Sequence, residues 1–167
     1  IFVPIMVAVV IGLFNGLIVT KFNANSVIIT LASLAVIRGI ALIFTGGKMV
    51  EGADASKFIL VGRTSFGGFP AYIFAFIFVA VILGILLNFT TLGRFVYYSG
   101  SNIDASKIAG IKIDNIRIYT FVISSVCAAI AAIILSSRLY TASPLTGNGY
   151  EFDAVAAIVV GGSSLMG

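Results

Sequence analysis

The sequence predicts an all-α, polytopic transmembrane bundle with about four membrane-spanning helices, and three observations lead to this prediction. Of the 167 residues, 60% are hydrophobic and only 10% are charged, whereas about 25% of the residues in soluble domains are charged. The charges are spaced so that several runs approach the roughly 20 residues that a helix needs to cross a bilayer. These runs do not alternate between apolar and polar residues, as the strands of a membrane barrel would.

Composition also excludes several other classes of protein. The chain has too few polar residues to cover the surface of a soluble domain and is too hydrophobic for a disordered segment. A single cysteine rules out a disulfide scaffold. The net charge is +4, but the basic residues are scattered singly and form no patch, so we expect no nucleic-acid partner.

The four expected spans cover residues 1–20, 27–44, 70–89 and 116–136, in one transmembrane domain over 1–167. The chain begins with isoleucine and ends in an apolar stretch, so we expect this domain to be partial. If every span crosses, the basic residues divide five to four, which favours the first set as cytoplasmic. The first set is Lys21, Arg94, Lys107, Lys112 and Arg117, and the second is Lys48, Lys57, Arg63 and Arg138.

A fifth uncharged run, residues 154–167, has a different character. Asp153 is expected to cap a helix that starts at Ala154, and Gly161 and Gly162 would end it after about eight residues, or about 12 Å. Such a helix is too short to cross. We interpret it as a broken or re-entrant helix, or as a packing site within a longer span.

Three charged residues are candidates for the transport pathway or its gating. Arg38 lies well inside the second span, and an ion within the membrane suggests function, although a snorkelling or carbonyl-paired arginine is the favoured interpretation. Glu151 and Asp153 flank the fifth segment. They could couple protons, but capping a helix N-terminus is favoured.

Small residues at four-residue spacing predict close helix packing. Gly12 and Gly16 in the first span form one such set. Ser124, Ala128 and Ala132 form another in the fourth span.

The polar stretch 90–115 is the most informative connection between spans. Ser101 or Asn102 is a good N-cap, and Gly110 supplies a left-handed stop, so we expect a two-turn helix over 103–109. Asp114 or Asn115 should then cap the next span. A helix this short is unstable alone, and the apolar Ile108 and Ile111 could supply a packing contact. The helix either covers the ends of the spans or docks against a cytoplasmic partner.

Two motifs resemble those of a known family. The segment Leu92-Gly-Arg-Phe-Val-Tyr-Tyr-Ser-Gly-Ser-Asn102 and its continuation to Ile111 resemble the cytoplasmic loop of permeases in sugar-importing ABC transporters of the ribose, xylose, arabinose and galactose type. The residues that match in order are Gly93, Arg94, Gly100, Asn102, Ala105, Gly110 and Ile111. The segment Ser143-Pro-Leu-Thr-Gly-Asn-Gly-Tyr-Glu-Phe-Asp153 and its continuation to Gly167 are similar to a second motif, with Phe152 in place of leucine.

The resemblance implies a permease subunit of the bacterial inner membrane. A second permease copy would complete the pathway in the bilayer, an extracytoplasmic sugar-binding protein would deliver a monosaccharide, and a cytoplasmic ABC ATPase would drive import. The short helix would be the coupling helix. Its ATPase-coupling residues would be Gly100, Asn102, Ala105, Ile108, Gly110 and Ile111.

We expect no catalytic residue, no metal site and no cofactor in this chain. Gly46-Gly-Lys48 lacks the first glycine of a phosphate loop, and Met49 replaces its Ser or Thr, so ATP would be bound by a partner subunit. The chain has no histidine. Three alternatives stay open: a branched-chain amino acid permease, an intramembrane enzyme using Ser163 or Ser164, and a scaffold subunit.

Overall fold

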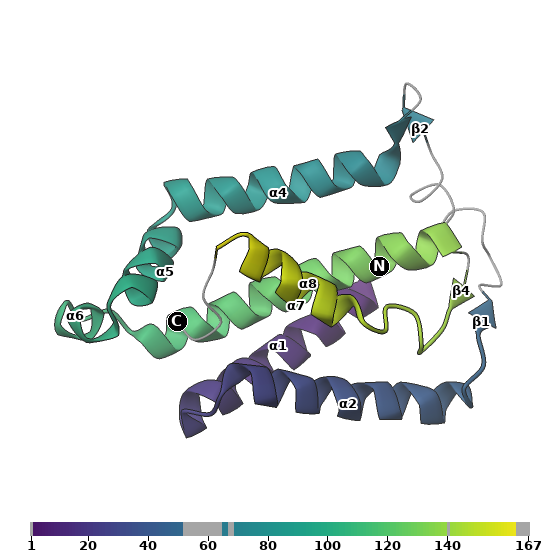
Figure 1. The fold of residues 1–167 in the computed structure, drawn as a ribbon, viewed down its shortest axis with the longest axis horizontal. Coiled ribbons are helices and arrows are strands. Elements are labelled where there is room, and N and C mark those ends of the chain that lie inside the picture. The colour runs from purple at the N-terminus through teal and green to yellow at the C-terminus, as the bar shows by residue number, and fades with distance from the viewer. Residues whose placement is uncertain (1, 52–64, 67–68, 140, 163–167) are drawn as a thin grey trace.

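The computed structural model describes residues 2–51, 65–66, 69–139 and 141–162. Four long helices run along the length of the molecule in Figure 1. They are α1 (Phe2–Phe22), α2 (Ser26–Thr45), α4 (Ala71–Phe89) and α7 (Ile113–Leu139). Each is long and apolar enough to cross a membrane by length and composition, and each corresponds to one predicted span. The predicted all-α transmembrane bundle is therefore confirmed.

Short strand pairs join the helices at one end of the bundle, which we call the β1–β4 end (Figure 1). β1 (Val50–Glu51) after α2 pairs antiparallel with β4 (Thr141–Ala142) after α7. β2 (Ser65–Phe66) pairs with β3 (Phe69–Pro70) just before α4. Strands of two residues have no periodicity to predict them. Lys57 and Arg63, expected on this side, lie outside the described residues.

The opposite end, which we call the α6 end, carries two helices where the sequence predicted one. α5 (Thr91–Ser101) follows α4 directly, and α6 (Ile103–Ile108) follows α5. The Thr90 hydroxyl accepts a hydrogen bond from the backbone N–H of Gly93 at 3.2 Å and donates one to the Leu86 carbonyl at 2.5 Å. Thr90 thus ends α4 and caps α5. Gly93 is buried against the backbone of Leu87, where no Cβ would fit.

The start of α7 corrects a prediction. α7 begins at Ile113, so neither Asp114 nor Asn115 caps it from outside, and Asp114 lies in its first turn instead. The backbone N–H of Ile116 bonds to the Lys112 carbonyl at 3.4 Å. Burial of Ile113 and Ile116 in this first turn favours the earlier start, because it removes apolar surface from water.

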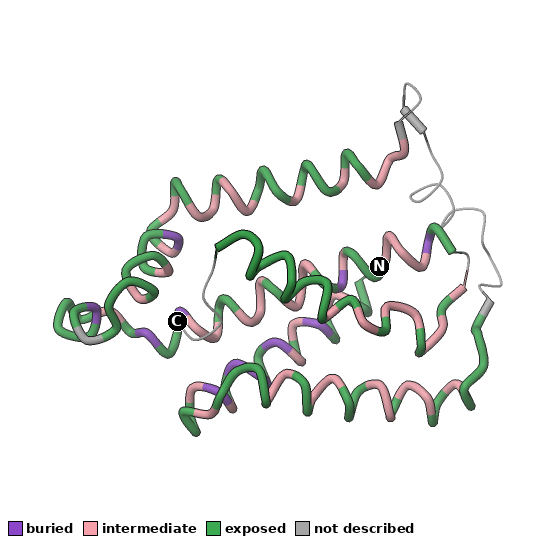
Figure 2. Tube along the Cα trace, in the orientation of Figure 1, coloured by how far each residue is buried: buried purple, intermediate pink, exposed green. Residues whose placement is uncertain are grey.

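The core lies between α1 and α7. One face of α1 is buried, at Ala8, Gly12, Asn15, Gly16 and Val19, and Figure 2 shows this face in purple. A Cβ on Gly12 would lie 2.9 Å from both the Phe121 carbonyl oxygen and the Val122 Cα, and one on Gly16 would lie 3.0 Å from the Ile118 Cα. The predicted close packing at Gly12 and Gly16 is therefore confirmed.

The second predicted packing set is wrong within this chain. Ser124, Ala128 and Ala132 are exposed, because α7 presents a different face to α1. The helices α2 and α4 have no buried residue among those described. Their apolar side chains are left for lipid or for other helices.

Candidate coupling and pathway sites

The first candidate site is α6, and its ends are built by local hydrogen bonds. Asn102 has an extended backbone, and its side-chain oxygen accepts a hydrogen bond from the backbone N–H of Ala105 at 3.0 Å. Gly110 has φ of 77°, a conformation that favours glycine. It lets the N–H of Ile111 return to the Ser106 carbonyl at 3.1 Å. Of the two predicted N-caps, Asn102 is the one used, and Gly110 provides the predicted stop.

A side chain that sequence reasoning missed holds α6 in place. Ser106 is buried, and its hydroxyl lies 2.9 Å from the Tyr98 carbonyl and 2.8 Å from the Asn102 carbonyl, to which it donates. The bond to Tyr98 ties α6 to α5. The available signal was a small hydroxyl side chain within a very short helix, where bonding back to a carbonyl is common.

The apolar residues of this region do not supply the packing contact that we expected. Ile108 is 88% exposed at the end of α6, and Ile111 is half-buried. Gly100, Ala105 and Gly110 are exposed as well. The chain thus presents a bare apolar tip at Ile108, because the polar contacts of Ser106 already fix the opposite side of this short helix.

The second candidate site is the start of α8 (Tyr150–Val160), which lies after a loop with two left-handed glycines. Gly147 has φ of 79° and Gly149 φ of 92°. The helix begins at Tyr150, so the predicted start at Ala154 and the predicted Asp153 cap are wrong. Gly149 is the N-cap, and its N–H donates to the Glu151 carboxylate at 3.0 Å.

The remaining features of α8 agree in part with expectation. Asp153 is exposed in the first turn, where a carboxylate complements the helix dipole. The helix ends at Gly161 and Gly162, as predicted. Its 11 residues span about 16 Å, which is too short to cross a bilayer. Ser163 and Ser164, the candidates for an intramembrane enzyme, lie outside the described residues.

One long-range hydrogen bond joins this loop to the second span. Nη1 of Arg38 donates to the side-chain oxygen of Asn148 at 2.6 Å, across 110 residues of sequence. Arg38 lies eight residues before Gly46, the C-cap of α2, which places it about 12 Å along the helix from that end. The loop from β4 turns back along the length of the helices before α8 starts, as Figure 1 shows.

This contact bears on the interpretations of Arg38 and of the fifth segment. Arg38 pairs with a side chain from a distant segment and not with a backbone carbonyl, and the snorkelling interpretation stays a prediction. Asn148 was not singled out, because a sequence gives no sign of which amide an arginine will meet. The reach of the loop to the depth of Arg38 favours a re-entrant helix.

The structure brings Arg38 and the α8 start together but keeps them apart from the α6 residues. Among the described residues, no three His, Cys, Asp or Glu side chains gather as a metal site would require.

The chain is similar to permeases of known transport systems. The family described as "Branched-chain amino acid transport system / permease component" matches residues 1–167. The L-arabinose transport system permease protein of Escherichia coli is 39% identical over 92% of this chain and 46% of its own length. The ribose import permease protein of Bacillus subtilis is 39% identical over 92% of this chain and 48% of its own.

A third relative is named for the import of a different compound. The autoinducer 2 import system permease protein of Yersinia pseudotuberculosis is 36% identical over 98% of this chain and 46% of its own length. The chain spans about half the length of the curated relatives it matches. No solved structure matches it. The resemblance to sugar-importer permeases is confirmed, and the chain belongs to the transport-system permease family that matches it from end to end.

Proposed function

We propose that this chain is part of a membrane-spanning permease subunit of an ATP-driven ABC importer, which translocates a monosaccharide delivered by a binding protein. The observation that carries the proposal is the match of over nine-tenths of the chain to permeases of arabinose and ribose import systems at 39% identity. The four apolar helices supply the membrane-spanning part that such a subunit requires.

Coupling to the ATPase is assigned to the α6 tip. Gly100, Asn102, Ala105, Ile108, Gly110 and Ile111 are the residues proposed for this contact. Ile108 is 88% exposed, and burying an isoleucine side chain against a partner contributes about 1.5–3 kcal/mol. Ser106 fixes the helix to α5, and α5 is continuous with α4 through Thr90. A push on the tip would therefore be passed through α5 to α4, the third span.

Gating is assigned to the junction of Arg38 with the loop before α8. The Arg38–Asn148 bond lies within the spanning region. This hydrogen bond can be either formed or broken, which gives the junction two states. Glu151 holds the glycine turn next to Asn148, and Asp153 lies two residues after Glu151 in the same first turn of α8. Opening and closing of this junction would change access to the pathway.

The proposed partners are those that a permease subunit of such an importer requires. ATP would be bound by a cytoplasmic ABC ATPase, without any cofactor in this chain. An extracytoplasmic sugar-binding protein would deliver the substrate, and a second permease copy, as a homodimer, would complete the pathway. The location would be the bacterial inner membrane, with the α6 end facing the cytoplasm.

The proposal is tested by reconstituting the permease with its ATPase and binding protein in proteoliposomes. Uptake of radiolabelled arabinose, ribose and leucine is measured with ATP, and with a non-hydrolysable ATP analogue as the control. We expect ATP-dependent uptake of a monosaccharide. Uptake of leucine alone would assign the transporter to the amino acid branch, and hydrolysis-independent uptake would overturn the ABC mechanism.

A further inference from the structure

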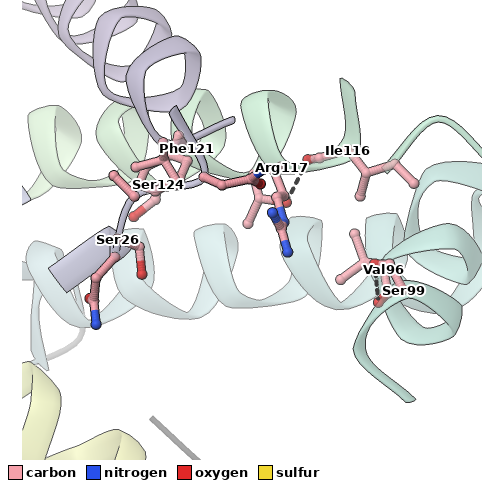
Figure 3. A pocket seen from close by; sticks show the side chains of 12 residues that line it. Ser26, Val96, Ser99, Ile116, Arg117, Phe121 and Ser124 are labelled. Carbon is pink, nitrogen blue, oxygen red and sulfur yellow. Dashed lines mark hydrogen bonds between the residues drawn. The ribbon is translucent and has the colours of Figure 1, made fainter. Parts of the chain in front are cut away.

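A cavity at the α6 end is not used by the coupling or gating sites. It has a volume of about 720 Å³ and lies between the α1–α2 turn, α5 and α7. Its polar lining includes Asn23, Ser26, Ser99, Arg117, Thr120 and Ser124, several of which Figure 3 shows around the opening. The volume falls within the range of about 300–1,000 Å³ that is typical of small-ligand sites.

The charge in this cavity is unbalanced. Arg117 is half-buried and is the only charged residue in the lining, which contains no acid. Within the described part of the chain, its guanidinium has no hydrogen bond or ion pair. A partly buried cation without a partner is costly. An anion bound in the cavity would remove that cost.

Other groups around the opening favour the same sign of ligand. Ser26 is the first residue of α2, so the positive end of the dipole of a 20-residue helix points to the cavity region. The hydroxyls of Thr120 and Ser99 already donate to the carbonyls of Ile116 and Val96. Recognition would therefore depend mainly on Arg117, with Ser26 and Ser124 as further donors.

The position of the cavity identifies the source of the anion. Arg117 is four residues past the start of α7, or about 6 Å along the helix, so it lies at the depth of lipid headgroups. Lys21, Arg94 and Lys112 are at the same end and are exposed. Basic pockets between spanning helices bind anionic lipid headgroups. The apolar lining residues Val96 and Phe121, which are half-buried, offer a surface for the acyl chains.

We propose that this cavity binds the phosphate group of an anionic phospholipid, with Arg117 as its main contact. This inference requires that the helices span a membrane, but it does not require that the permease transports any particular substrate. A lipid held here would touch the α1–α2 turn, α5 and α7 at once. It would link the α1–α7 pair to the helix that carries α6.

Native mass spectrometry of the detergent-solubilised chain tests the proposal. The protein is mixed with equal amounts of phosphatidylglycerol and phosphatidylcholine that have identical acyl chains, and the bound populations are compared. We expect preferential binding of phosphatidylglycerol. Arg117→Gln should reduce the preference about tenfold, as expected for losing a charged hydrogen bond. Arg94→Gln, a matched control on an exposed arginine outside the lining, should change it less than about twofold.

Two further comparisons test where the preference for phosphatidylglycerol comes from. Equal losses in Arg117→Gln and Arg94→Gln would overturn the site in favour of diffuse surface attraction. Displacement of phosphatidylglycerol by millimolar inorganic phosphate would overturn the lipid in favour of a free anion. If Arg117→Gln folds poorly, Arg117→Lys and Ser124→Val replace it. A lower preference for phosphatidylglycerol in either variant supports the proposal, and no change in both overturns it.

Discussion

The α1–α7 pair and the short helices α6 and α8 are held by different kinds of interaction. The pair is held by close packing, with Gly12 and Gly16 directly against the backbone of α7. By contrast, α6 and α8 are held by a few hydrogen bonds: Ser106 to Tyr98, and Arg38 to Asn148. Every described residue of α8 after Glu151 is exposed.

This difference separates a fixed part of the molecule from parts that can move. Packed backbones leave no room for small displacements, so α1 and α7 must move as one body. A single hydrogen bond can break and re-form at a small net cost. We therefore infer that conformational change during transport is concentrated at α6 and at the Arg38–Asn148 junction.

The largest expected effect comes from breaking the fixed part. Gly12→Leu places a side chain where even a Cβ would meet the backbone of Phe121 and Val122 at 2.9 Å. The free energy of unfolding should fall by about 3 kcal/mol, because the helices must separate. Helix content followed by circular dichroism during SDS titration measures this.

Gly39→Leu is the matched control for Gly12→Leu. Gly39 also lies within a spanning helix, but a Cβ there has no atom within 4 Å among those described. Its stability should stay within about 0.5 kcal/mol of the parent chain. Equal destabilisation at both positions would show that α1 and α7 are not packed as described.

The next largest effect is expected from variants of α6 that disturb the proposed coupling of ATP hydrolysis to uptake. Gly110→Pro cannot adopt φ of 77°, because the proline ring fixes φ near −65°, and Ala105→Asp places a charge on the exposed tip. ATP-driven uptake in proteoliposomes should fall at least about tenfold, the loss expected for about 1.4 kcal/mol or more. Membrane insertion and basal ATP hydrolysis should be retained, because the spans are untouched.

The control for this pair of variants is Gly84→Ala, outside the residues proposed for coupling. Gly84 lies within α4 and has no positive φ, a Cβ there would meet no described atom within 4 Å, and alanine favours a helix. Uptake by this variant should stay within about twofold of the parent, a change of about 0.4 kcal/mol. Normal uptake by both Gly110→Pro and Ala105→Asp would remove α6 from the coupling pathway.

The elements that could be predicted from the sequence are those determined by residues close together in the chain. Long apolar runs predicted the spans, and Asn102 and Gly110 predicted both ends of α6, because a cap depends on residues within one turn. The start of α8 was misplaced because Asp153 is a good cap by composition. Gly149, with its left-handed backbone, ends the loop earlier.

The contacts that organise the site were beyond prediction because they are not local. Arg38 meets Asn148 only through the path of the loop after β4, and no spacing in the sequence encodes that path. The same holds for α7, whose small residues at 124, 128 and 132 are exposed. Spacing predicted a face suited to close packing, but not the face that α1 uses.

A smaller effect is expected from the Arg38–Asn148 junction. Arg38→Ala and Asn148→Ala each remove the 2.6 Å hydrogen bond, and an exposed bond of this kind contributes about 1 kcal/mol. Sugar uptake should change several-fold in each single variant. In the double variant the changes should not add, because both remove one interaction.

The double-mutant cycle on initial uptake rates is the measurement. Arg38→Lys keeps the charge and should retain part of the coupling energy to Asn148. Additive effects of the two alanine substitutions would mean that the bond has no role in transport.

The smallest expected effect is at the cap of α6. Asn102→Ala removes the bond from the side-chain oxygen to the N–H of Ala105 and should destabilise the helix by about 1 kcal/mol. Asn102→Asp keeps an acceptor at the same position and should have little effect. Hydrogen exchange at the amides of α6 measures the difference, with those of α7 as the internal reference. If exchange in α6 accelerates about fivefold while α7 is unchanged, α6 is stabilised locally and can shift without disturbing the packed pair. If both accelerate together, the short helix and the pair form one cooperative unit, and the distinction between them fails.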